Sequence, residues 1–278
     1  MKNGKLCWIR RICRAGAIIA ALWTVIEMDS LSLCIENFIS FMEMLGDSPC
    51  GDLFRAPGDG LAGASGLTSA GENYAIFGPG ATENDLSSVV GFFGLRRLPF
   101  SVPLFPGLDD KFARALERHG VVPRHEYAAM SLPLAGLPRE TDDAAAAVAD
   151  TQSLAAWTSA VWLGFGDQGR PNLPYARHAA YLASCPANRL FYLAEEGKAV
   201  CAGLLHQSEH VCGLYYFATP PEFRRRGFAL RLLKTLSAQA AQASDQLVLL
   251  ATEEGRPVYE KFGFQALAMV PVRMKGEE

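Results

Sequence analysis

Apolar side chains recur at helical and strand spacings along the first half of the chain. Spacing of three and four residues predicts helices in three segments: 31–45, 83–94 and 108–119. Thr82 is placed to cap the second of these helices, and Gly120 to end the third. Short apolar runs predict strands at 74–77, 100–105 and 127–132. Pro103 favours an edge position for the middle strand, and the Gly-, Pro- and Ser-rich segment 46–71 predicts loops around one short strand.

The second half begins after a polar, proline-bearing linker at 133–143. The alanine-rich segment 144–165 predicts a helix that carries Trp157 and Trp162, for which core packing is the simplest role. Further strands are predicted at 190–194, 199–206, 214–217, 247–251 and 264–274. Helical spacing over 228–240 and around Tyr259 places helices between the last three strands.

Composition narrows the class of protein. With 278 residues, the chain is long enough for two domains and a substantial core. Half of the residues are hydrophobic, a fifth are charged and the net charge is −3, which is ordinary for a globular protein and argues against nucleic acid as a partner. The seven cysteines form no CxxC pair, so we expect reduced thiols, no metal site and a cytoplasmic location.

Residues 1–27 differ from the rest, because five basic residues precede an apolar run at 15–26. About 12 apolar residues are too few for a membrane span, which needs roughly 20. No small-residue cleavage site follows. A targeting segment and an ordered appendage are alternatives, but we favour a leader outside the fold, with Met28 as the true start.

The most informative stretch is 211–236, VCGLYYFATPPEFRRRGFALRLLKTL. A strand ends at Pro220 and Pro221, since neither residue can donate to a sheet ladder. Arg224, Arg225, Arg226 and Gly227 then open a helix. Free backbone N–H groups at the start of a helix, with arginines beside them, suit an anion such as a phosphate.

Two common phosphate loops are excluded, because the sequence lacks GxxxxGK followed by Ser or Thr and lacks three glycines in dinucleotide spacing. Arg224-x-x-Gly227-x-Ala229 instead resembles the Gln/Arg-x-x-Gly-x-Gly/Ala signature of the GNAT superfamily of acyl-CoA-dependent N-acetyltransferases. The strand at 247–250 and GRPVYEKFGF at 255–264 resemble that family's later strand and tyrosine-bearing helix. The resemblance covers roughly residues 150–274.

The resemblance implies a GNAT-like α/β (α+β) fold, with a mixed, mostly antiparallel central sheet flanked by helices. It implies acetyl-CoA as co-substrate and no metal. The residues it assigns to acetyl-CoA are Phe217, Ala218 and Thr219 for the pantetheine arm, and Arg224, Arg225, Arg226, Gly227, Phe228, Ala229 and Leu230 for the pyrophosphate. Tyr259 takes the place of the family's proton donor to the departing thiolate, although a packed helix tyrosine is the alternative. Trp157 and Trp162 then border the acceptor pocket if they do not simply pack in the core.

The general base remains open. Gly213 stands where some family members have a glutamate, and Thr252 where many have an asparagine. Residues that could act instead are His206, Glu209, His210, Tyr215 and Glu253, each of which has a surface or packing role as its simpler interpretation.

A faint repeat aligns 115–121 with 258–264. Chance similarity is one interpretation, because helix, glycine C-cap and strand is a common unit, and a tandem arrangement is the other. We expect a degenerate GNAT-like domain at 28–135, without an arginine–glycine loop, and a GNAT acetyltransferase domain at 143–278. The predicted reaction is direct acetyl transfer from acetyl-CoA to a primary amine on a small molecule or peptide. A non-catalytic acyl-CoA-binding regulator is the alternative. We expect a monomer or homodimer without a stable membrane span.

Overall fold

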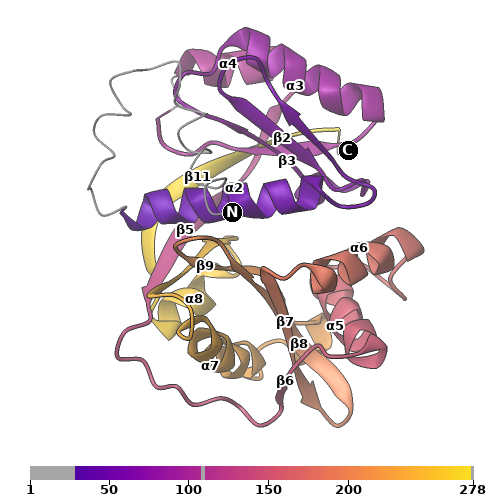
Figure 1. Cartoon of the computed structure of the whole chain (residues 1–278), viewed down its shortest axis with the longest axis vertical. Helices are drawn as coiled ribbons and strands as arrows, with labels where there is room; N and C mark the ends of the chain where they lie inside the picture. The colour runs from indigo at the N-terminus through magenta and orange to yellow at the C-terminus, as the bar shows by residue number, and fades with distance from the viewer. Residues whose placement is uncertain (1–28, 108–109, 277–278) are drawn as a thin grey trace, which may run out of the picture. The chain divides into compact units, whose positions relative to one another are not determined.

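The computed structural model describes residues 29–107 and 110–276 (Figure 1). The prediction for residues 1–27 therefore lies outside the described residues. The chain divides into two compact units. Among described residues, the first unit contains residues 29, 42–107, 110–126 and 270–276, and the second contains 30–41 and 127–269.

The first unit is a small mixed sheet with helices. Three antiparallel strands, β1 (Asp52–Arg55), β2 (Gly60–Ala64) and β3 (Asn73–Phe77), are followed by α3 (Glu83–Arg96). A short 3₁₀ helix, η1 (Ala70–Glu72), precedes β3. Strand β4 (Phe100–Pro103) runs parallel to β3 and antiparallel to β11 (Gln265–Lys275). Helix α4 (Asp110–Arg118) and strand β5 (Val122–Pro133) complete this half of the sequence, and large apolar side chains such as Phe93 and Phe100 stack in the core.

The second unit has the strand order β6–β7–β8–β9–β10–β5. Its strands are β6 (Ala145–Ala147), β7 (Asn188–Glu195), β8 (Lys198–Gln207), β9 (Cys212–Ala218) and β10 (Gln246–Ala251). Its helices are α5 (Thr151–Gly164), α6 (Leu173–Ser184), α7 (Phe228–Ala240), α8 (Arg256–Phe262) and residues 30–41 of α2 (Ser30–Gly46), with a 3₁₀ turn, η2 (Pro221–Phe223), before α7. Helices α5 and α6 cover one face of this sheet and α7 the other (Figure 1).

The two halves of the sequence share one order of elements. Strand pairs β1–β2–β3 and β7–β8–β9 are antiparallel, and each triplet is followed by a helix and then a strand parallel to the third one. A second helix and a last strand follow in both halves. The last strand of each half is shared between the compact units, because the unit boundaries fall within β5 and within β11. The compact units thus differ from the linear division at residues 135 and 143.

Three local predictions were wrong. Residues 46–71 contain two strands, because Leu61 and Ala62 bury their side chains in a β1–β2 hairpin. Strand β4 has a partner on both sides, and Pro103, its last residue, lies opposite Val272 of β11, beyond the β3 pair of Tyr74 with Ser101. Residues 144–165 are not one helix. Ala145–Ala147 pair with β7, and Asp150 begins α5 through a capping box with Ser153.

Helix α6 was not predicted, although its start carries a recognisable signal. Asn172 caps the helix by accepting a hydrogen bond from Tyr175 N–H, and Pro174 follows within the first turn. Its buried positions Tyr175, His178, Ala179 and Leu182 have helical spacing. The helix matters for the site described below because it carries His178.

Candidate functional site

Strands β9 and β10 separate partway along their length. Their parallel register holds two pairs, Leu247 with Cys212 and Val248 with Gly213, whereas β9 continues to Ala218 and β10 to Ala251. On the other side, β9 stays paired with β8 as far as Ala218. The β10-facing edge of β9 beyond Gly213 therefore offers main-chain donors and acceptors to an extended ligand. Phe217 and Ala218, predicted for the pantetheine arm, lie on this edge, with Thr219 directly after it.

A bulge turns two consecutive tyrosines to the same face of β9. The β8–β9 register shifts between Ala202 and Leu204, and Tyr216 has a φ of 49°. A bulge disturbs the strict alternation of side chains, so Tyr215 and Tyr216 both contact Phe41 of α2. The carbonyl of Gly203 at the shift accepts a hydrogen bond from the indole N–H of Trp157 at 3.0 Å. Trp157 is fully buried, which confirms its packing role.

The arginine–glycine loop connects β9 to α7. After η2, Arg225 and Gly227 have positive φ angles of 60° and 84°, and Gly227 is the N-cap of α7. A Cβ on Gly227 would meet no atom within 4 Å, so the backbone angle, rather than crowding, favours glycine. The first hydrogen bond at this end joins Arg231 N–H to the Gly227 carbonyl at 3.2 Å. The N–H groups before it belong to the turn that a helix leaves without an internal partner.

The three arginines beside this turn differ in their contacts. Arg224 donates to the carbonyls of Thr219 (3.1 Å) and Gly164 (2.9 Å), so its guanidinium ties the end of β9 to the end of α5. Arg225 and Arg226 are exposed, and Arg226 lies 5.0 Å from the ring centroid of Phe228. The loop therefore presents two exposed cations beside the start of α7, and a third that stabilises its base.

Helix α7 is anchored on both of its sides. Phe228, Leu232, Leu233 and Leu236 are buried in the core of the second unit. On the outer side, Arg231 pairs with Asp142 at 2.7 Å and with Glu195 at 3.3 Å. The hydrogen bond from Arg231 lowers the pKa of the Asp142 carboxyl, which is the main cause of its shift. These contacts fix the position of the helix start that carries the loop.

Tyr259 lies across the β9 edge from the two strand tyrosines. It belongs to α8, and its ring centroid is 5.8 Å from that of Phe217 and 5.5 Å from that of Phe264. The side chain is buried, and burial raises the pKa of its hydroxyl, so it keeps its proton at neutral pH. Nearby, Thr219 donates to the thiol of Cys201 at 3.3 Å, and burial raises the pKa of that thiol to about 12. Cys201 is therefore held as an inert thiol.

The position of the absent glutamate is filled by a side chain from α2. A Cβ on Gly213 would lie 1.9 Å from Oδ1 of Asn37. The Asn37 amide donates to the carbonyls of His206 (3.2 Å) and Val211 (3.0 Å), and its Oδ1 accepts from the Tyr215 hydroxyl at 2.8 Å. Asn37 is fully buried. A carboxylate on Gly213 is therefore incompatible with this packing, and sequence reasoning did not single out Asn37.

The five alternative bases are not gathered at the open edge. His206 is buried, with Nδ1 2.8 Å from Asn188 Oδ1 and Nε2 3.0 Å from Ser40 Oγ, and burial lowers its pKa to about 4. The hydroxyl of Tyr215 is held by Asn37. Glu209 and His210 are exposed in the turn before β9, and Glu253 in the turn after β10. The histidine that does contact a strand tyrosine is His178, whose Nε2 lies 2.9 Å from the hydroxyl of Tyr216.

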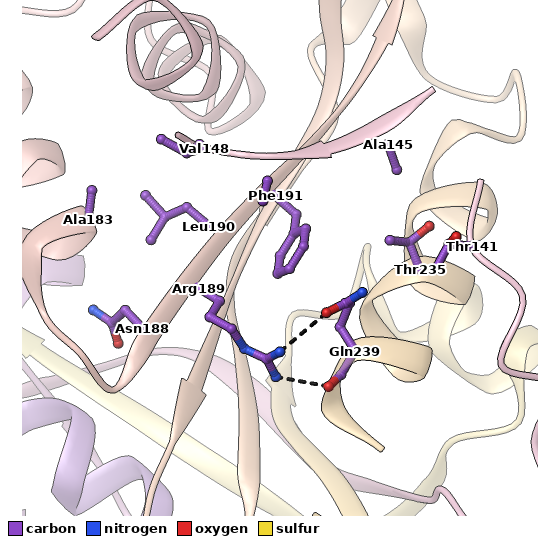
Figure 2. Close-up of a pocket in the computed structure, with 11 residues that line it drawn as sticks. Thr141, Ala145, Val148, Ala183, Asn188, Arg189, Leu190, Phe191, Thr235 and Gln239 are labelled. Carbon is purple, nitrogen blue, oxygen red and sulfur yellow. Dashed lines mark hydrogen bonds between the residues drawn. The ribbon is translucent and has the colours of Figure 1, made fainter. Parts of the chain in front are cut away.

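A hollow of about 410 Å³ lies elsewhere in the second unit (Figure 2). Its wall includes Arg189, which donates to the Gln239 carbonyl (2.9 Å) and to Gln239 Oε1 (3.3 Å). This arginine thereby satisfies the C-terminal end of α7. None of the residues that line the hollow belongs to the predicted site. We therefore assign it no role in the chemistry.

The corresponding helix start in the first unit carries carboxylates instead of arginines. Asp85 accepts from the N–H groups of Gly58 (2.7 Å) and Thr82 (2.8 Å), and Asp59 accepts from Gly80 N–H at 3.0 Å. A phosphate at this helix start would need these same N–H groups, which the two carboxylates already occupy. The negative charge of the carboxylates would also repel a phosphate. The carboxylates at this helix start therefore disfavour a phosphate there, and the degenerate character of this half stays a prediction.

The described part of the chain contains neither a cluster of metal ligands nor a helix that could span a membrane. Within 29–107 and 110–276, no three His, Cys, Asp or Glu side chains gather as a metal site would require. In the same part of the chain, every helix is too short or too polar to cross a bilayer.

This chain is similar to known proteins in two ways: one part of its sequence matches a domain family, and its fold matches solved structures. The profile of the acetyltransferase (GNAT) domain matches residues 173–276. No curated protein matches the sequence at a significant level. The profile match includes α6, the open edge of β9, the arginine–glycine loop and Tyr259.

Solved structures with the same fold cover nearly the whole chain. A GCN5-related N-acetyltransferase from Kribbella flavida has a TM-score of 0.64 at 16% identity, covering 88% of this chain and 96% of that one. A functionally unknown conserved protein from Staphylococcus epidermidis has a TM-score of 0.60 at 13% identity, covering 87% and 99%. A tandem GNAT protein from the clavulanic acid biosynthesis pathway has a TM-score of 0.53 at 12% identity, covering 92% and 91%.

These matches confirm the expected fold class, a mixed and mostly antiparallel sheet flanked by helices in a tandem arrangement. At such low identities the structural likeness concerns the fold, whereas the profile match concerns one domain. Residues 173–276 therefore match the acetyltransferase (GNAT) domain, on a chain whose fold is similar to those of a GCN5-related N-acetyltransferase and of a tandem GNAT protein.

Proposed function

We propose that the second unit transfers an acetyl group from acetyl-CoA to a primary amine by direct attack. The observation that carries the proposal is that two binding features, an open strand edge and an arginine–glycine loop, follow each other directly within the matched domain. The open edge of β9 runs into the exposed arginine–glycine loop at the start of α7. An extended, phosphate-bearing ligand needs both features in this order.

The residues fit acetyl-CoA as a ligand. The pyrophosphate would accept hydrogen bonds from backbone N–H groups, in the segment Arg225, Arg226, Gly227, Phe228, Ala229 and Leu230. Arg224 would hold this segment in place through the Thr219 and Gly164 carbonyls. The pantetheine arm would pair with the main chain of Phe217, Ala218 and Thr219. The same main-chain donors can stabilise negative charge on the acyl oxygen.

Bound acetyl-CoA supplies an already activated acyl group. Tyr259 has the properties of a general acid for the departing sulfur, because burial keeps its hydroxyl protonated. A covalent route through Cys201 is disfavoured, because a buried thiol with a pKa of about 12 is not a nucleophile at neutral pH. The acceptor amine therefore attacks directly.

A non-catalytic acyl-CoA-binding regulator is the second candidate. Asn37 favours it, because this side chain fills the place where a carboxylate base would stand over Gly213. Tyr259 favours the enzyme. We further propose a cytoplasmic monomer or homodimer whose halves, 28–135 and 143–278, are a degenerate and an intact GNAT-like domain.

The two candidates are separated by measuring binding and turnover on the full-length protein. Acetyl-CoA should raise the melting temperature by mass action. Free thiol should then be released from acetyl-CoA with at least one member of an amine panel containing spermidine, lysine, phenethylamine and a peptide with a free N-terminus. A thermal shift without thiol release from any amine selects the regulator. If neither signal is seen, both proposals are wrong.

A further inference from the structure

Two polar side chains meet beside the open edge of β9 without any role in the proposal above. Nε2 of His178, on α6, lies 2.9 Å from the hydroxyl of Tyr216, on β9. His178 is 6% exposed, whereas Tyr216 is half-buried. The contact therefore joins a buried imidazole to the hydroxyl of a half-buried tyrosine on β9.

The backbone aims Tyr216 at this histidine. Its φ of 49° is unusual for a bulky side chain within a strand, and such strain concentrates at functional sites. The two neighbouring tyrosines have different partners: the Tyr215 hydroxyl contacts Asn37, and the Tyr216 hydroxyl contacts His178. Tyr216 directly precedes Phe217, where the proposed pantetheine segment begins.

Tyr216 and Tyr259 approach the β9 edge from opposite faces. Tyr216 packs among rings on the face covered by α2 and α5, with centroid distances of 6.1 Å to Phe41 and 5.8 Å to Trp157. Phe217, the next residue, turns to the other face and contacts Tyr259. An acyl group on this edge would have one hydroxyl on each side. That arrangement suits an amine arriving from one face and a thiolate leaving toward the other.

His178 is a neutral imidazole beside Tyr216, 2.9 Å from its hydroxyl, and in the tautomer with the proton on Nδ1 its Nε2 accepts a hydrogen bond from that hydroxyl. Burial lowers its pKa to about 4, so the imidazole is neutral at neutral pH. The rings of Trp157 and of Phe165, which is 58% exposed, lie 5.8 and 6.4 Å from the Tyr216 ring. The fully buried Trp157 packs against the Tyr216 ring, whereas Phe165 is exposed beside it.

We propose that Tyr216 is the catalytic residue that takes the proton from the acceptor amine, and that His178 is the positioning residue that relieves Tyr216 of its own proton. This inference rests on the proposed acetyl transfer and assigns the base which that reaction requires. It also explains how a domain with Gly213 in place of a carboxylate can still be an enzyme.

The protons and bonds balance as follows. The amine nitrogen forms a bond to the acyl carbon, and the carbon–sulfur bond breaks. One amine proton passes to the Tyr216 oxygen, while the Tyr216 hydroxyl proton passes to His178 Nε2. The departing sulfur takes the proton of Tyr259. Once the products leave, the Tyr216 hydroxyl releases one proton to solvent and takes back the proton on His178 Nε2, and solvent returns one proton to Tyr259, so the enzyme is restored.

The test compares Tyr216→Phe with Tyr215→Phe, its neighbour on the same face. We expect Tyr216→Phe to lower kcat by about 10²-fold, within the range of acid–base groups. The KM of Tyr216→Phe for acetyl-CoA should stay within about threefold of the wild-type value, because no binding contact is lost. The rise in melting temperature with acetyl-CoA should also be close to that of the wild type. Tyr215→Phe should keep kcat within about threefold. The acceptor is whichever panel amine the wild type acetylates fastest.

His178→Gln adds a variant that keeps a hydrogen-bonding group but cannot accept a proton from Tyr216. We expect a loss in kcat close to that of Tyr216→Phe, and a double variant no worse than either single one. Without substrate, the NMR signals of the His178 ring should shift in Tyr216→Phe and not in Tyr215→Phe. An unaltered kcat in a folded Tyr216→Phe variant of an active enzyme overturns the relay alone. A wild type that binds acetyl-CoA but releases no thiol overturns the proposed function with it.

Discussion

Tyr259 is the residue on which the acid role depends. Tyr259→Phe removes one hydroxyl and retains the ring contacts with Phe217 and Phe264. We expect kcat to fall by about 10²-fold, while the KM for acetyl-CoA hardly changes, because the proton is needed only as the thiolate departs. Steady-state kinetics with the best panel amine measures this. An unchanged kcat, with chemistry shown to be rate-limiting, would remove Tyr259 from the mechanism.

Gly227 tests the phosphate-binding loop. Its φ of 84° strains any L-residue, and Gly227→Glu adds a negative charge where we place the pyrophosphate. We expect Gly227→Glu to abolish the thermal shift with acetyl-CoA. Gly227→Ala is the matched control, because it introduces the strain without the charge and should keep part of the shift. Equal shifts in the glutamate variant and the wild type would place the phosphate elsewhere.

Gly213 tests the packing that replaces a carboxylate base. A methyl group there would lie 1.9 Å from Asn37 Oδ1, so Gly213→Ala must displace a side chain with three hydrogen bonds. We expect a loss of about 1–3 kcal/mol in unfolding free energy. The double variant Gly213→Ala, Asn37→Ala should lose less than the sum of the single variants, because both act on one contact. Additive losses in denaturant titrations would contradict the contact.

At the residue scale, the sequence was informative where the candidate site residues lie close together along the chain. Arg224, Gly227, Ala229 and Tyr259 stand in two short motifs, and the structure places those motifs on the expected helix start and helix. Asn37 and His178 could not be found in the same way. Each meets β9 through pairing of elements far apart in the sequence, and a single asparagine or histidine on a helix carries no signal of that contact.

At the scale of elements, the position of α7 relative to its neighbours depends in part on the Arg231–Asp142 pair. The folded-state pKa of Asp142 is lowered, so the pair stabilises the native state above the unfolded pKa of about 3.9. This contribution is lost as pH falls through the lower, folded value. We expect Asp142→Asn to reduce the melting temperature by a few degrees at pH 7.

The gap between Asp142→Asn and the wild type should narrow as the pH falls below about 4 and close only below the lowered folded-state pKa, where the wild-type carboxyl is protonated as well. Glu260→Gln is the control, because it breaks the exposed Arg256–Glu260 pair within α8 and should change stability less. Thermal melts across pH decide the matter. A gap that persists at acid pH would show that the lost hydrogen-bond geometry, rather than charge, matters.

The elements themselves were only partly predictable. Regular periodicity gave α2, α3 and α7 close to their observed bounds, since their apolar faces are continuous. The prediction of a helix from residue 144 was wrong because alanine favours a helix locally, whereas pairing with β7 makes β6 a strand. The bulge at Tyr216 has no sequence signal, as tyrosine is an ordinary strand residue whose φ is set here by its neighbours.

At the scale of the whole molecule, the repeat was visible but the division into units was not. Helix, glycine and strand repeat in both halves, whereas the pairing of β5 with β10 joins residues more than 100 positions apart. No local pattern encodes such a partner. The linker at 133–143 thus separates the two halves in sequence, while the second compact unit extends back to residue 127 and includes part of α2.

This difference predicts how fragments of the chain behave. A fragment of residues 143–278 lacks the six β5 residues paired with β10, and lacks Asp142, the partner of Arg231. It also lacks four buried core side chains: Ala128, Met130, Leu132 and Leu134. Full burial of one large apolar side chain is worth about 1.5–3 kcal/mol, so their loss approaches the stability of a typical domain. We expect this fragment to be insoluble or only partly folded.

A fragment of residues 127–278 restores β5 and Asp142 and is the matched comparison. We expect it to be more soluble than the 143–278 fragment, to melt more cooperatively and to retain a thermal shift with acetyl-CoA. Both fragments lack α2, so neither contains Asn37, and any difference between them arises from residues 127–142. The measurements are circular dichroism melts with and without acetyl-CoA. If the shorter fragment folds and binds acetyl-CoA equally well, the boundary near residue 143 is the correct one, and the β5 pairing contributes little to the stability of the second unit.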